Sequence, residues 1–492
     1  MKKLYTLLGC ALMLFACNTE KEMDVTVYET SASGAKLTVK TEFTTGDSAA
    51  TITLLPEQKF QTITGIGGSF TQASAHLLNG LSPEKRKEVI DAYFSDEGAR
   101  YSLTRTHMNS CDFSTEQYFY APVPDDMLLD SFSIEHDRGD IIPMIKEAMA
   151  ASSDGFKIIS SPWTAPPWMK DNNHHVGGKL LPKYYKPWAL FYSKYLEAYK
   201  AEGIDIWGLT VVNEPHGNGN NWESMHFSPK EMTDFVREYM GPQLEKDGHD
   251  VKILGYDQNR EGIKEWVDEM YKDEESSKYY DGTAIHWYES TYEVFPEALQ
   301  YAHEKAPNKY LIETEGCIDS EVPKWQDDAW YWSKEATDWG YDWRPDSLKY
   351  LHPKYAPVNR YARDIIGCLN NWVDGWVDWN MVLNKQGGPN WFENWCAAPV
   401  LVDAETDEVY FTPLYYTMAH FSKFIRPGAL KIGLETTDKN IQTTAVQNPD
   451  GSIAVVVFNE GTTTKNFTLN LEGVNKSFSI EGQAIQTIVI QD

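Results

Sequence analysis

Cysteine is scarce in this chain, with only 6 among 492 residues, and two of those lie in the first 17 positions. The remaining four are spaced like neither a zinc site nor a disulfide framework: Cys111, Cys317, Cys368 and Cys396. A chain of this length can bury a large core without covalent staples. We therefore expect four free, buried thiols that pack as small side chains.

Positive charge is also in short supply. The chain has 44 Lys and Arg against 72 Asp and Glu, which gives a formal net charge of −28. Such a surface repels phosphate backbones and anionic lipid, whereas a neutral polymer is tolerated. Nucleic acid is therefore not an expected partner. No stretch repeats with a period of 20 to 50 residues, which argues against a solenoid.

Aromatic residues, by contrast, are plentiful. They make up 13% of the chain, with 17 Trp and 28 Tyr. Hydrophobic residues reach 42% and charged residues 24%, which is an ordinary composition for a globular protein with a large core. Core packing accounts for most of the rings, but an excess also suits stacking on the apolar faces of sugars.

The first residues have the form of a targeting signal. Lys2 and Lys3 precede an apolar run over 4–16 that is too short to span a bilayer as a mature helix. The run ends in Leu-Phe-Ala-Cys17, which resembles a bacterial lipobox and implies cleavage before Cys17 and diacylation of its thiol. An ordinary signal peptide cleaved nearby is the alternative. We expect a signal peptide over 1–16, a tether over 17–23, and an exported, lipid-anchored bacterial lipoprotein, on the cell surface or the periplasmic face of the outer membrane. We expect it to be a monomer that contacts the membrane only through lipid.

The rest of the chain alternates between two patterns. Short runs with strand-like alternation, separated by turn residues, occupy 24–60 and recur over 429–492. Between them, over 61–428, apolar strands alternate with helical patterns. The simplest arrangement is a β-sandwich built from both ends of the chain, with an α/β barrel inserted between its halves.

Eight strands are predicted in the middle segment. They cover 62–67, 101–108, 157–161, 206–214, 251–256, 282–287, 310–315 and 375–380. Residues 73–94 are predicted to form one helix, and the aromatic stripe from Trp188 to Tyr199 is predicted to be helix core. Eight strands with intervening helices predict a (β/α)8 TIM barrel.

Two of these strands end in carboxylates. The run over 206–212 stops at Asn213-Glu214-Pro215, and the run over 308–313 stops at Glu315. Reactive groups sit at the C-terminal ends of the strands of such a barrel. A lone Asn-Glu-Pro after an apolar strand is more often a turn or a helix start. Two facing carboxylates, however, are what glycoside hydrolysis requires, one to protonate the leaving oxygen and one to attack carbon or activate water.

Further motifs stand at the other strand ends in a characteristic order. They are GIGG at 65–68, CDFS at 111–114, SPWTAPPWMK at 161–170, VNEP at 212–215, HWY at 286–288, TEGC at 314–317 and DWN at 378–380. From about Gly65 to Asp403 the chain resembles glycoside hydrolase family 30, which includes lysosomal glucosylceramidase and microbial β-glucanases and β-xylosidases. A G-x-G-G alone would be a weak signal, but this ordered set is highly specific.

The resemblance implies the roles of the two carboxylates. Glu214 is implied as the general acid and base, and Glu315 as the nucleophile of a double displacement through a covalent glycosyl-enzyme. Glu214 must then be protonated at working pH and Glu315 ionised. Their side-chain oxygens should face each other across one cavity, about 5 Å apart.

The resemblance also implies the substrate-binding residues. Arg105 braces the nucleophile and Asn213 binds the sugar 2-hydroxyl; the other implied contacts are Asp112, Trp163, His286, Tyr288 and Trp379. Arg105 could equally be a structural ion-pair partner, and Trp163 could be pure core. His286 has no second ligand at metal spacing on its strand. No metal or organic cofactor is needed, because two carboxylates suffice for the reaction.

Two positions complicate the assignment. Gln72 stands where the family usually has an acid. Glu313 lies two residues before Glu315, so both are expected on one face of the strand, which makes Glu313 a rival nucleophile. We favour Glu315 because it stands at the exit of the strand, and we expect Glu313 a layer deeper, paired with a cation of the barrel.

The substrate is the least determined feature. Export and the resemblance to microbial glucanases favour β-1,6-linked glucan cut internally. Alternatives within the family are an exo-acting β-glucosidase, a β-xylosidase or a glucosylceramidase, the last of which would imply sphingolipid metabolism. A non-catalytic glycan-binding lipoprotein is the alternative from another class, but a binder needs neither an acid nor a nucleophile.

Overall fold

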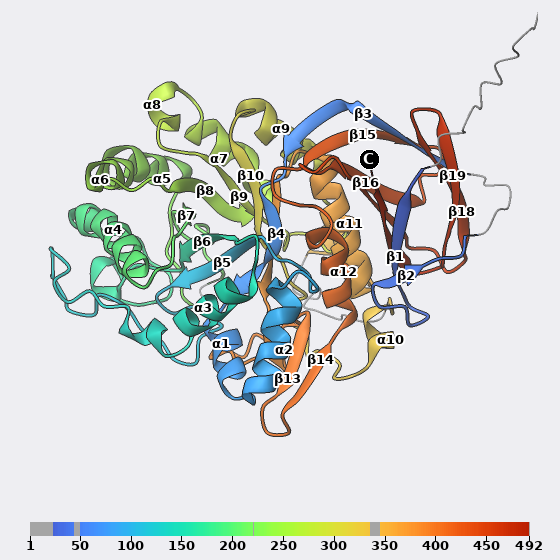
Figure 1. The fold of residues 1–492 in the computed structure, drawn as a ribbon. Coiled ribbons are helices and arrows are strands. Elements are labelled where there is room, and N and C mark those ends of the chain that lie inside the picture. The colour runs from blue at the N-terminus through green and yellow to red at the C-terminus, as the bar shows by residue number, and fades with distance from the viewer. Residues whose placement is uncertain (1–22, 44–49, 220, 335–344, 492) are drawn as a thin grey trace, which may run out of the picture.

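The computed structural model describes residues 23–43, 50–219, 221–334 and 345–491. At its centre a closed parallel barrel has the spatial order β10-β11-β4-β5-β6-β7-β8-β9 (Figure 1). Its strands are β4 Gly65–Phe70, β5 Leu103–Met108, β6 Lys157–Pro162, β7 Gly208–Thr210, β8 Lys252–Asn259, β9 Gly282–His286, β10 Tyr310–Glu315 and β11 Gly375–Asn380. The predicted TIM barrel is confirmed. The predicted signal peptide and the lipidated Cys17 lie outside the described residues.

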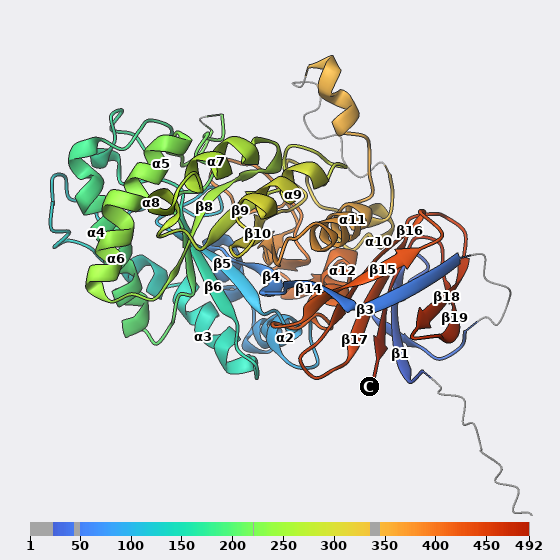
Figure 2. The ribbon, with the colours of Figure 1, turned by 90° about the horizontal axis from the view of Figure 1, so that it is seen from above.

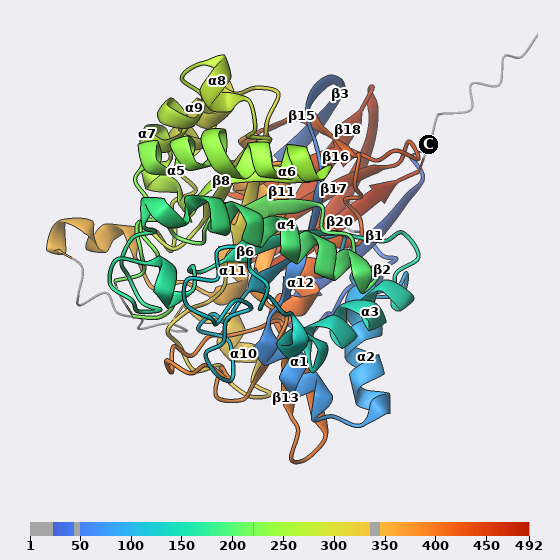
Figure 3. The same cartoon turned by 90° about the vertical axis from the view of Figure 1, so that its left-hand side faces the viewer.

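Helices surround the barrel, and α4 to α7 cover the side that faces the viewer in Figure 3. The helices are α1 Gln72–Asn79, α2 Pro83–Phe94, α3 Ile141–Ala151, α4 Tyr185–Ala201, α5 Pro229–Phe235, α6 Gly241–Asp247, α7 Ile263–Met270, α8 Glu274–Ser277, α9 Pro296–Lys305, α10 Asp328–Tyr331, α11 Pro357–Asn370 and α12 Pro413–Ser422. Within the described ranges, none of the helices is both long and apolar enough to cross a bilayer. The aromatic stripe of α4 is buried, as predicted; it comprises Trp188, Phe191, Tyr192, Tyr195 and Tyr199.

The prediction of a single helix over 73–94 is wrong. The chain forms α1 and α2, separated by Gly80 and Leu81. Ser82 caps α2 by accepting a hydrogen bond from the backbone of Lys85, and Pro83 occupies the first turn, where its missing N–H costs nothing. These start signals override the continuous apolar spacing.

Several strand boundaries also differ from the prediction. Thr62 ends a strand of the sandwich, so the first barrel strand begins only at Gly65. β7 is confined to Gly208–Thr210, and the chain that follows departs from regular strand geometry before it reaches Glu214. It remains attached to its neighbours, because the Asn213 N–H donates to Pro162 O at 2.8 Å and the Glu214 N–H to Asp257 O at 3.0 Å.

The sandwich is built from both ends of the chain, as predicted. Its nine strands have the order β19-β18-β3-β15-β16-β17-β20-β1-β2, so β3 lies between the C-terminal strands β18 and β15, and β1 pairs with the C-terminal strand β20 (Figure 2). The strands are β1 Val25–Ser31, β2 Thr38–Lys40, β3 Ala50–Thr62, β15 Leu430–Thr436, β16 Ile441–Gln447, β17 Ile453–Asn459, β18 Lys465–Leu471, β19 Val474–Ile480 and β20 Ala484–Ile490. Side chains from both ends share one apolar core, in which Val27 and Leu54 join Phe467 and Ile488. Near the barrel, β12 Val382–Asn384, β13 Val400–Asp403 and β14 Glu408–Phe411 form a small separate sheet.

His420 on α12 joins the barrel to the sandwich. Its Nδ1 lies 2.8 Å from Thr487 Oγ1 and its Nε2 2.9 Å from Thr30 Oγ1. The side chain is fully buried, and burial lowers the pKa of His420 to about 3. The imidazole is therefore neutral in the folded protein near neutral pH.

Candidate active site

The site stands on an apolar layer inside the barrel. Leu103, Ile159, Leu254, Ala284, Ile312 and Val377 form a separate buried cluster. Alternate residues of a strand point to the same side, so the residues two positions further along point inward above this layer. They include Arg105, Ser161, His286, Thr314 and Trp379. The change from apolar to polar inward residues thus positions the chemistry at the C-terminal ends of the strands.

Asp257 is the centre of this polar layer. Its Oδ2 accepts hydrogen bonds from Arg105 Nη2 at 2.8 Å and Thr210 Oγ1 at 2.7 Å. Its Oδ1 accepts from Thr314 Oγ1 at 2.7 Å and lies 3.0 Å from His286 Nε2. Burial opposes ionisation, but the charges of Arg105 and His286 outweigh it and hold the pKa of Asp257 well below its usual range.

Sequence reasoning missed Asp257 because the fifth strand was predicted to end at Tyr256. β8 continues to Asn259, with a register shift between Tyr256 and Gln258 and positive φ at both Tyr256 and Asp257. This bulge turns Asp257 into the barrel. The available signal was the polar triplet Asp-Gln-Asn directly after an apolar run, the same kind of signal that identified Glu214.

Glu315 is fixed by donors on both of its oxygens. Arg105 Nη1 donates to Oε2, and the Tyr288 hydroxyl donates to Oε1 at 2.9 Å. Arg105 itself is fully buried, and its Nη2 also donates to Asn213 Oδ1 at 2.8 Å. Burial raises the pKa of Glu315, although the positive charges of His286 and Arg105 work against the shift.

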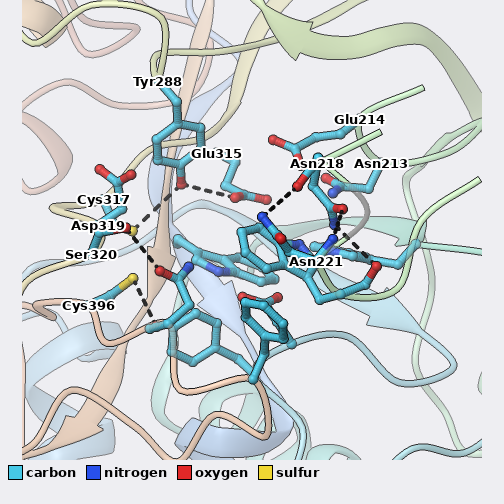
Figure 4. Close-up of a pocket in the computed structure, with 18 of the residues that line it drawn as sticks. Asn213, Glu214, Asn218, Asn221, Tyr288, Glu315, Cys317, Asp319, Ser320 and Cys396 are labelled. Carbon is cyan, nitrogen blue, oxygen red and sulfur yellow. Dashed lines mark hydrogen bonds between the residues drawn. The ribbon is translucent and has the colours of Figure 1, made fainter. Parts of the chain in front are cut away.

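Glu214 follows the short strand β7 and adopts φ of +50°, in the left-handed region that non-glycine residues seldom occupy. Its backbone is held on both sides, because its N–H donates to Asp257 O and its carbonyl accepts from the Gly217 N–H at 2.7 Å. Its Oε1 lies 3.5 Å from His286 Nδ1. In Figure 4 the carboxylates of Glu214 and Glu315 lie in the same pocket.

His286 lies beneath both carboxylates rather than in the cavity wall. It is fully buried, with Asp257 on one ring nitrogen and Glu214 near the other. Burial by itself lowers its pKa, but the charges of Glu315, Asp257 and Glu214 outweigh burial and raise the pKa of His286 to about 10. His286 is therefore an imidazolium at neutral pH, and it acts on substrate only through its neighbours.

The cavity has a volume of about 610 Å³. Seven of the nine predicted site residues line it: Asp112, Trp163, Asn213, Glu214, Tyr288, Glu315 and Trp379. Trp163 and Trp379 stack with ring centroids 5.1 Å apart. Asp112 accepts a hydrogen bond from Asn390 Nδ2 at 3.1 Å, and burial raises the pKa of Asp112 well above its usual range. Arg105 and His286 are not among the lining residues.

The outer half of the cavity was not predicted in detail. Its lining consists largely of amide, hydroxyl and aromatic side chains at the end of β8 and on the loops that follow β7, β10 and β12: Asn218, Asn221, Trp222, Gln258, Asn259, Asp319, Ser320, Phe392 and Asn394. Cys317 and Cys396 also line it, and all four cysteines within the described ranges are free and buried. Loop residues of this kind carry no periodic signal, so only the fold brings them together.

Glu313 is not the residue that faces the cavity. The register of β10 shifts between Glu313 and Glu315, so the two do not share a face as predicted. Glu313 instead turns toward α11, where Arg260 donates to its Oε2 from Nη2 at 2.6 Å and also binds Asp364. The expected pairing with a barrel cation is thus present. Burial raises the pKa of Glu313 to about 8.

Gln72 serves the structure rather than the pocket. Its Oε1 accepts from the Thr115 N–H and its Nε2 donates to Thr115 Oγ1, both at 3.1 Å. It therefore pins the loop after β5 to the start of α1. In the described parts of the chain, no three His, Cys, Asp or Glu side chains are grouped so that they could hold a metal ion.

Comparison with known proteins identifies the family. Residues 63–425 match the glycosyl hydrolase family 30 TIM-barrel domain, and residues 428–488 match the family 30 beta sandwich domain. The lysosomal acid glucosylceramidase of Mus musculus is 35% identical over 448 residues, covering 87% of this chain and 82% of that protein. An endo-1,6-beta-D-glucanase of Aspergillus fumigatus is 26% identical over 459 residues, covering 87% and 85%.

A solved endo-β-1,6-glucanase structure superposes with a TM-score of 0.80 at 28% identity, covering 95% of this chain and all of that one. Two matched domains that together span most of the chain, a relative above 30% identity and a shared fold agree. The chain is therefore a glycan-cleaving hydrolase that belongs to glycoside hydrolase family 30.

Proposed function

We propose that this protein is a retaining β-glucoside hydrolase that cuts β-1,6-linked glucan internally, with Glu315 as nucleophile and Glu214 as general acid and base. The observation that supports it is the pair of carboxylates in one cavity with unlike surroundings. Glu315 is held by donors on both oxygens, which suits an ionised nucleophile. Glu214 has a 13% exposed side chain and no such clamp, which suits a group that passes a proton to and from the substrate.

The charges of the polar layer fit this division of roles. Arg105 and His286 are positive, while Asp257 and Glu315 are negative. The charges of these four groups balance one another, so the buried layer supports Glu315 as the anion that a nucleophile must be.

The proposed sequence of steps follows from this geometry. Glu315 attacks the anomeric carbon as Glu214 protonates the departing oxygen, and Glu214 then removes a proton from the water that releases the sugar. When Glu315 forms the ester bond to the sugar it loses its negative charge, and the negative charge then lies on Glu214, which has given up its proton. Arg105 thus loses one ionic partner but keeps Asp257. Arg105 therefore does not move between steps. Asn213, whose amide oxygen is fixed by Arg105, presents its amide nitrogen to the sugar.

The outer half of the cavity favours a sugar as leaving group. Asn218 and Asn221 are held by hydrogen bonds within their own loop, Gln258 accepts from the His216 N–H, and Asn259 accepts from the Tyr288 N–H. An amide that met a lipid chain would lose its remaining hydrogen bonds to water without replacement, whereas sugar hydroxyls replace them. The likeness to endo-β-1,6-glucanases supports the linkage.

Glucosylceramide is the second candidate. The glucosylceramidase relative has the higher sequence identity, 35% against 26%. Because a ceramide leaving group is apolar, the amide-lined outer half argues against it. Turnover of detergent-dispersed glucosylceramide at a rate above that of every glucan would overturn the choice of glucan.

Two measurements test the proposal. Proton NMR of the first turnovers should show the β-anomer as the initial product, because double displacement retains configuration. An initial α-anomer would disprove the retaining mechanism. Reducing-end release should then be compared across β-1,3-, β-1,4- and β-1,6-glucans and xylan. Internal cutting of β-1,6-glucan gives oligosaccharides early; monosaccharide as the sole product would disprove internal cutting.

We also propose that the protein is exported and anchored by lipid on Cys17. The support is the lipobox-like Leu-Phe-Ala-Cys17 after a short apolar run. Mass spectrometry of the mature N-terminus tests it. An unmodified residue other than Cys17 at that terminus would exclude the anchor.

A further inference from the structure

Asp319 is a carboxylate in the cavity for which the proposed chemistry has no use. It lies four residues beyond Glu315, on the loop after β10, and its side chain is 14% exposed. Figure 4 places it beside Cys317 and Ser320, on the side of the pocket that carries Tyr288. In the described part of the chain, no other side chain donates a hydrogen bond to it. Its oxygens are therefore available to a ligand.

The cation nearest to Asp319 stands behind the cavity wall. Arg360 Nη1 is 3.8 Å from Asp319 Oδ1, too far for a hydrogen bond, and Arg360 does not line the cavity. Arg360 instead donates to the Tyr355 hydroxyl at 3.0 Å and to Trp287 O at 3.2 Å, with its guanidinium 3.8 Å from the centre of the Trp287 ring. Its charge thus stabilises an ionised Asp319 without reaching a ligand. Burial raises the pKa of Asp319 to about 6 even so, and the group is ionised at neutral pH.

The wall as a whole offers acceptors without cations. Four carboxylates line the cavity, those of Asp112, Glu214, Glu315 and Asp319, and among its described lining residues there is no Lys, Arg or His. Asp112 is already bound by Asn390, and the two glutamates act on the bond to be cleaved. Asp319 is thus the one carboxylate of this wall that neither a described side-chain hydrogen bond nor the proposed chemistry occupies.

From this arrangement we infer that Asp319 determines the leaving group: it accepts hydrogen bonds from a neutral or amino-bearing sugar and excludes acidic sugars. The inference rests on the proposed function. A hydroxyl or ammonium group can donate to Asp319, and a hydrogen bond to an ionised group is stronger than one between neutral groups. A sulfate group on that sugar would face a like charge with no side-chain cation from the described wall to pair with it, and like charges side by side in a desolvated site disfavour binding.

Matched disaccharides test the inference. Each carries β-1,6-linked glucose on glucose, glucosamine or glucose 3-sulfate, all of which keep the 6-hydroxyl that this linkage needs, and kcat/KM is measured at pH 7.5. We expect the sulfated substrate to be cleaved at least about tenfold more slowly than the glucose substrate, and the glucosamine substrate at least as fast as the glucose one. In Asp319→Asn the ratio of sulfated-substrate to glucose-substrate cleavage should rise at least about tenfold. Release of nitrophenol from an aryl β-glucoside, which offers Asp319 no hydroxyl, should stay within about threefold.

Asp250→Asn is the control, because it removes the same charge from a fully exposed position outside the cavity. It should leave every ratio unchanged. Wild-type cleavage of the sulfated substrate as fast as the glucose substrate would overturn the inference, as would an Asp319→Asn ratio equal to that of the wild type. An equal loss of kcat/KM in Asp319→Asn on the aryl glucoside and on the disaccharides would also overturn the inference, since it would indicate a structural role for Asp319. If the wild type cleaves no β-glucoside at all, including the aryl glucoside, the proposed function fails first.

Discussion

Replacement of Asp257 by Asn tests the network beneath the two glutamates. The substitution keeps the shape of the side chain but removes its charge. It also replaces one of the two acceptor oxygens with an amide nitrogen, which donates hydrogen bonds. Each oxygen now faces two donors, Arg105 and Thr210 on Oδ2 and Thr314 and His286 on Oδ1. Arg105 cannot lose a proton, whereas an imidazole can. The amide nitrogen should therefore turn toward His286, which becomes neutral and accepts.

The magnitude follows from the bonds that change. The Arg105 bond to Oδ2 persists but loses its anionic acceptor, and the His286 bond loses its charge altogether. A hydrogen bond to a charged group contributes about 1.5–3 kcal/mol. Since 1.36 kcal/mol corresponds to a factor of ten in rate, a loss of one such bond in the transition state lowers kcat/KM by roughly 10- to 150-fold.

The pH profile distinguishes this effect from general damage. Of the charged groups around Glu315, His286 lowers the pKa of Glu315 most. The charge of Asp257 raises that pKa, but by less than His286 lowers it. Loss of both charges therefore raises the pKa of Glu315, and the acidic limb of kcat/KM should move to higher pH. The assay is hydrolysis of an aryl β-glucoside between pH 4 and pH 9, with thermal unfolding of the same samples as a measure of stability.

Asp364→Asn is the matched control. Asp364 is a buried carboxylate that accepts two bonds from Arg260, but it lies on α11 and does not line the cavity. Asp364→Asn should lose about as much stability as Asp257→Asn, since breaking a buried ion pair costs about 3–5 kcal/mol. The acidic limb of its kcat/KM profile should not shift. The reasoning is refuted if Asp257→Asn keeps wild-type kcat/KM, or if its acidic limb stays where it is in the wild type.

Further variants separate the other roles. Glu315→Gln should lower turnover by several orders of magnitude and abolish labelling by an activated fluoro-sugar, found by peptide mass spectrometry on Glu315 in the wild type; a label on Glu313 would reverse the assignment. Glu313→Gln should keep activity within about tenfold near pH 6. The pKa of Glu313 is about 8, so the wild-type side chain is already protonated at pH 6, and its Oε1 accepts no hydrogen bond that an amide nitrogen at that position would lose. Glu214→Ala should lose most turnover of unactivated glucosides. Added azide should restore turnover of nitrophenyl β-glucoside, with nitrophenol as the leaving group and β-glucosyl azide as the sugar product; an α-glucosyl azide would contradict retention. His420 has a folded pKa of about 3 against an ordinary 6.5, so the unfolded chain binds the extra proton between these values, and the unfolding temperature should fall as pH drops from 6.5 toward 3. His420→Gln should flatten that slope, and an unchanged slope would exclude His420 as its source.

The sequence was most informative where the barrel is most regular. Apolar runs of strand length, separated by helical patterns, predicted all eight strands and the sandwich made from both termini. Such patterns are local, because a buried parallel strand must be apolar on both faces whatever its partners. The polar residues that interrupt those runs marked Glu214 and Glu315 for the same local reason.

Prediction failed where backbone geometry departs from regular periodicity. The expectation that Glu313 and Glu315 share a face assumed an unbroken strand, and the register shift between them removes that premise. Asp257 was overlooked because a bulge, rather than alternation, turns it inward. A bulge depends on the pairing with neighbouring strands, which alternation along one strand does not reveal.

By itself, then, the sequence determined the barrel, the order of its strands and the two glutamates, because these depend on periodicity and on residue type at strand ends. The tertiary structure alone decided which charges neutralise one another beneath the glutamates, that His286 lies behind the cavity, and that Asp319 lines it. The physical reason is that a side chain's partners, its burial and therefore its charge are set by residues more than a hundred positions away, as with Arg105 and Glu315.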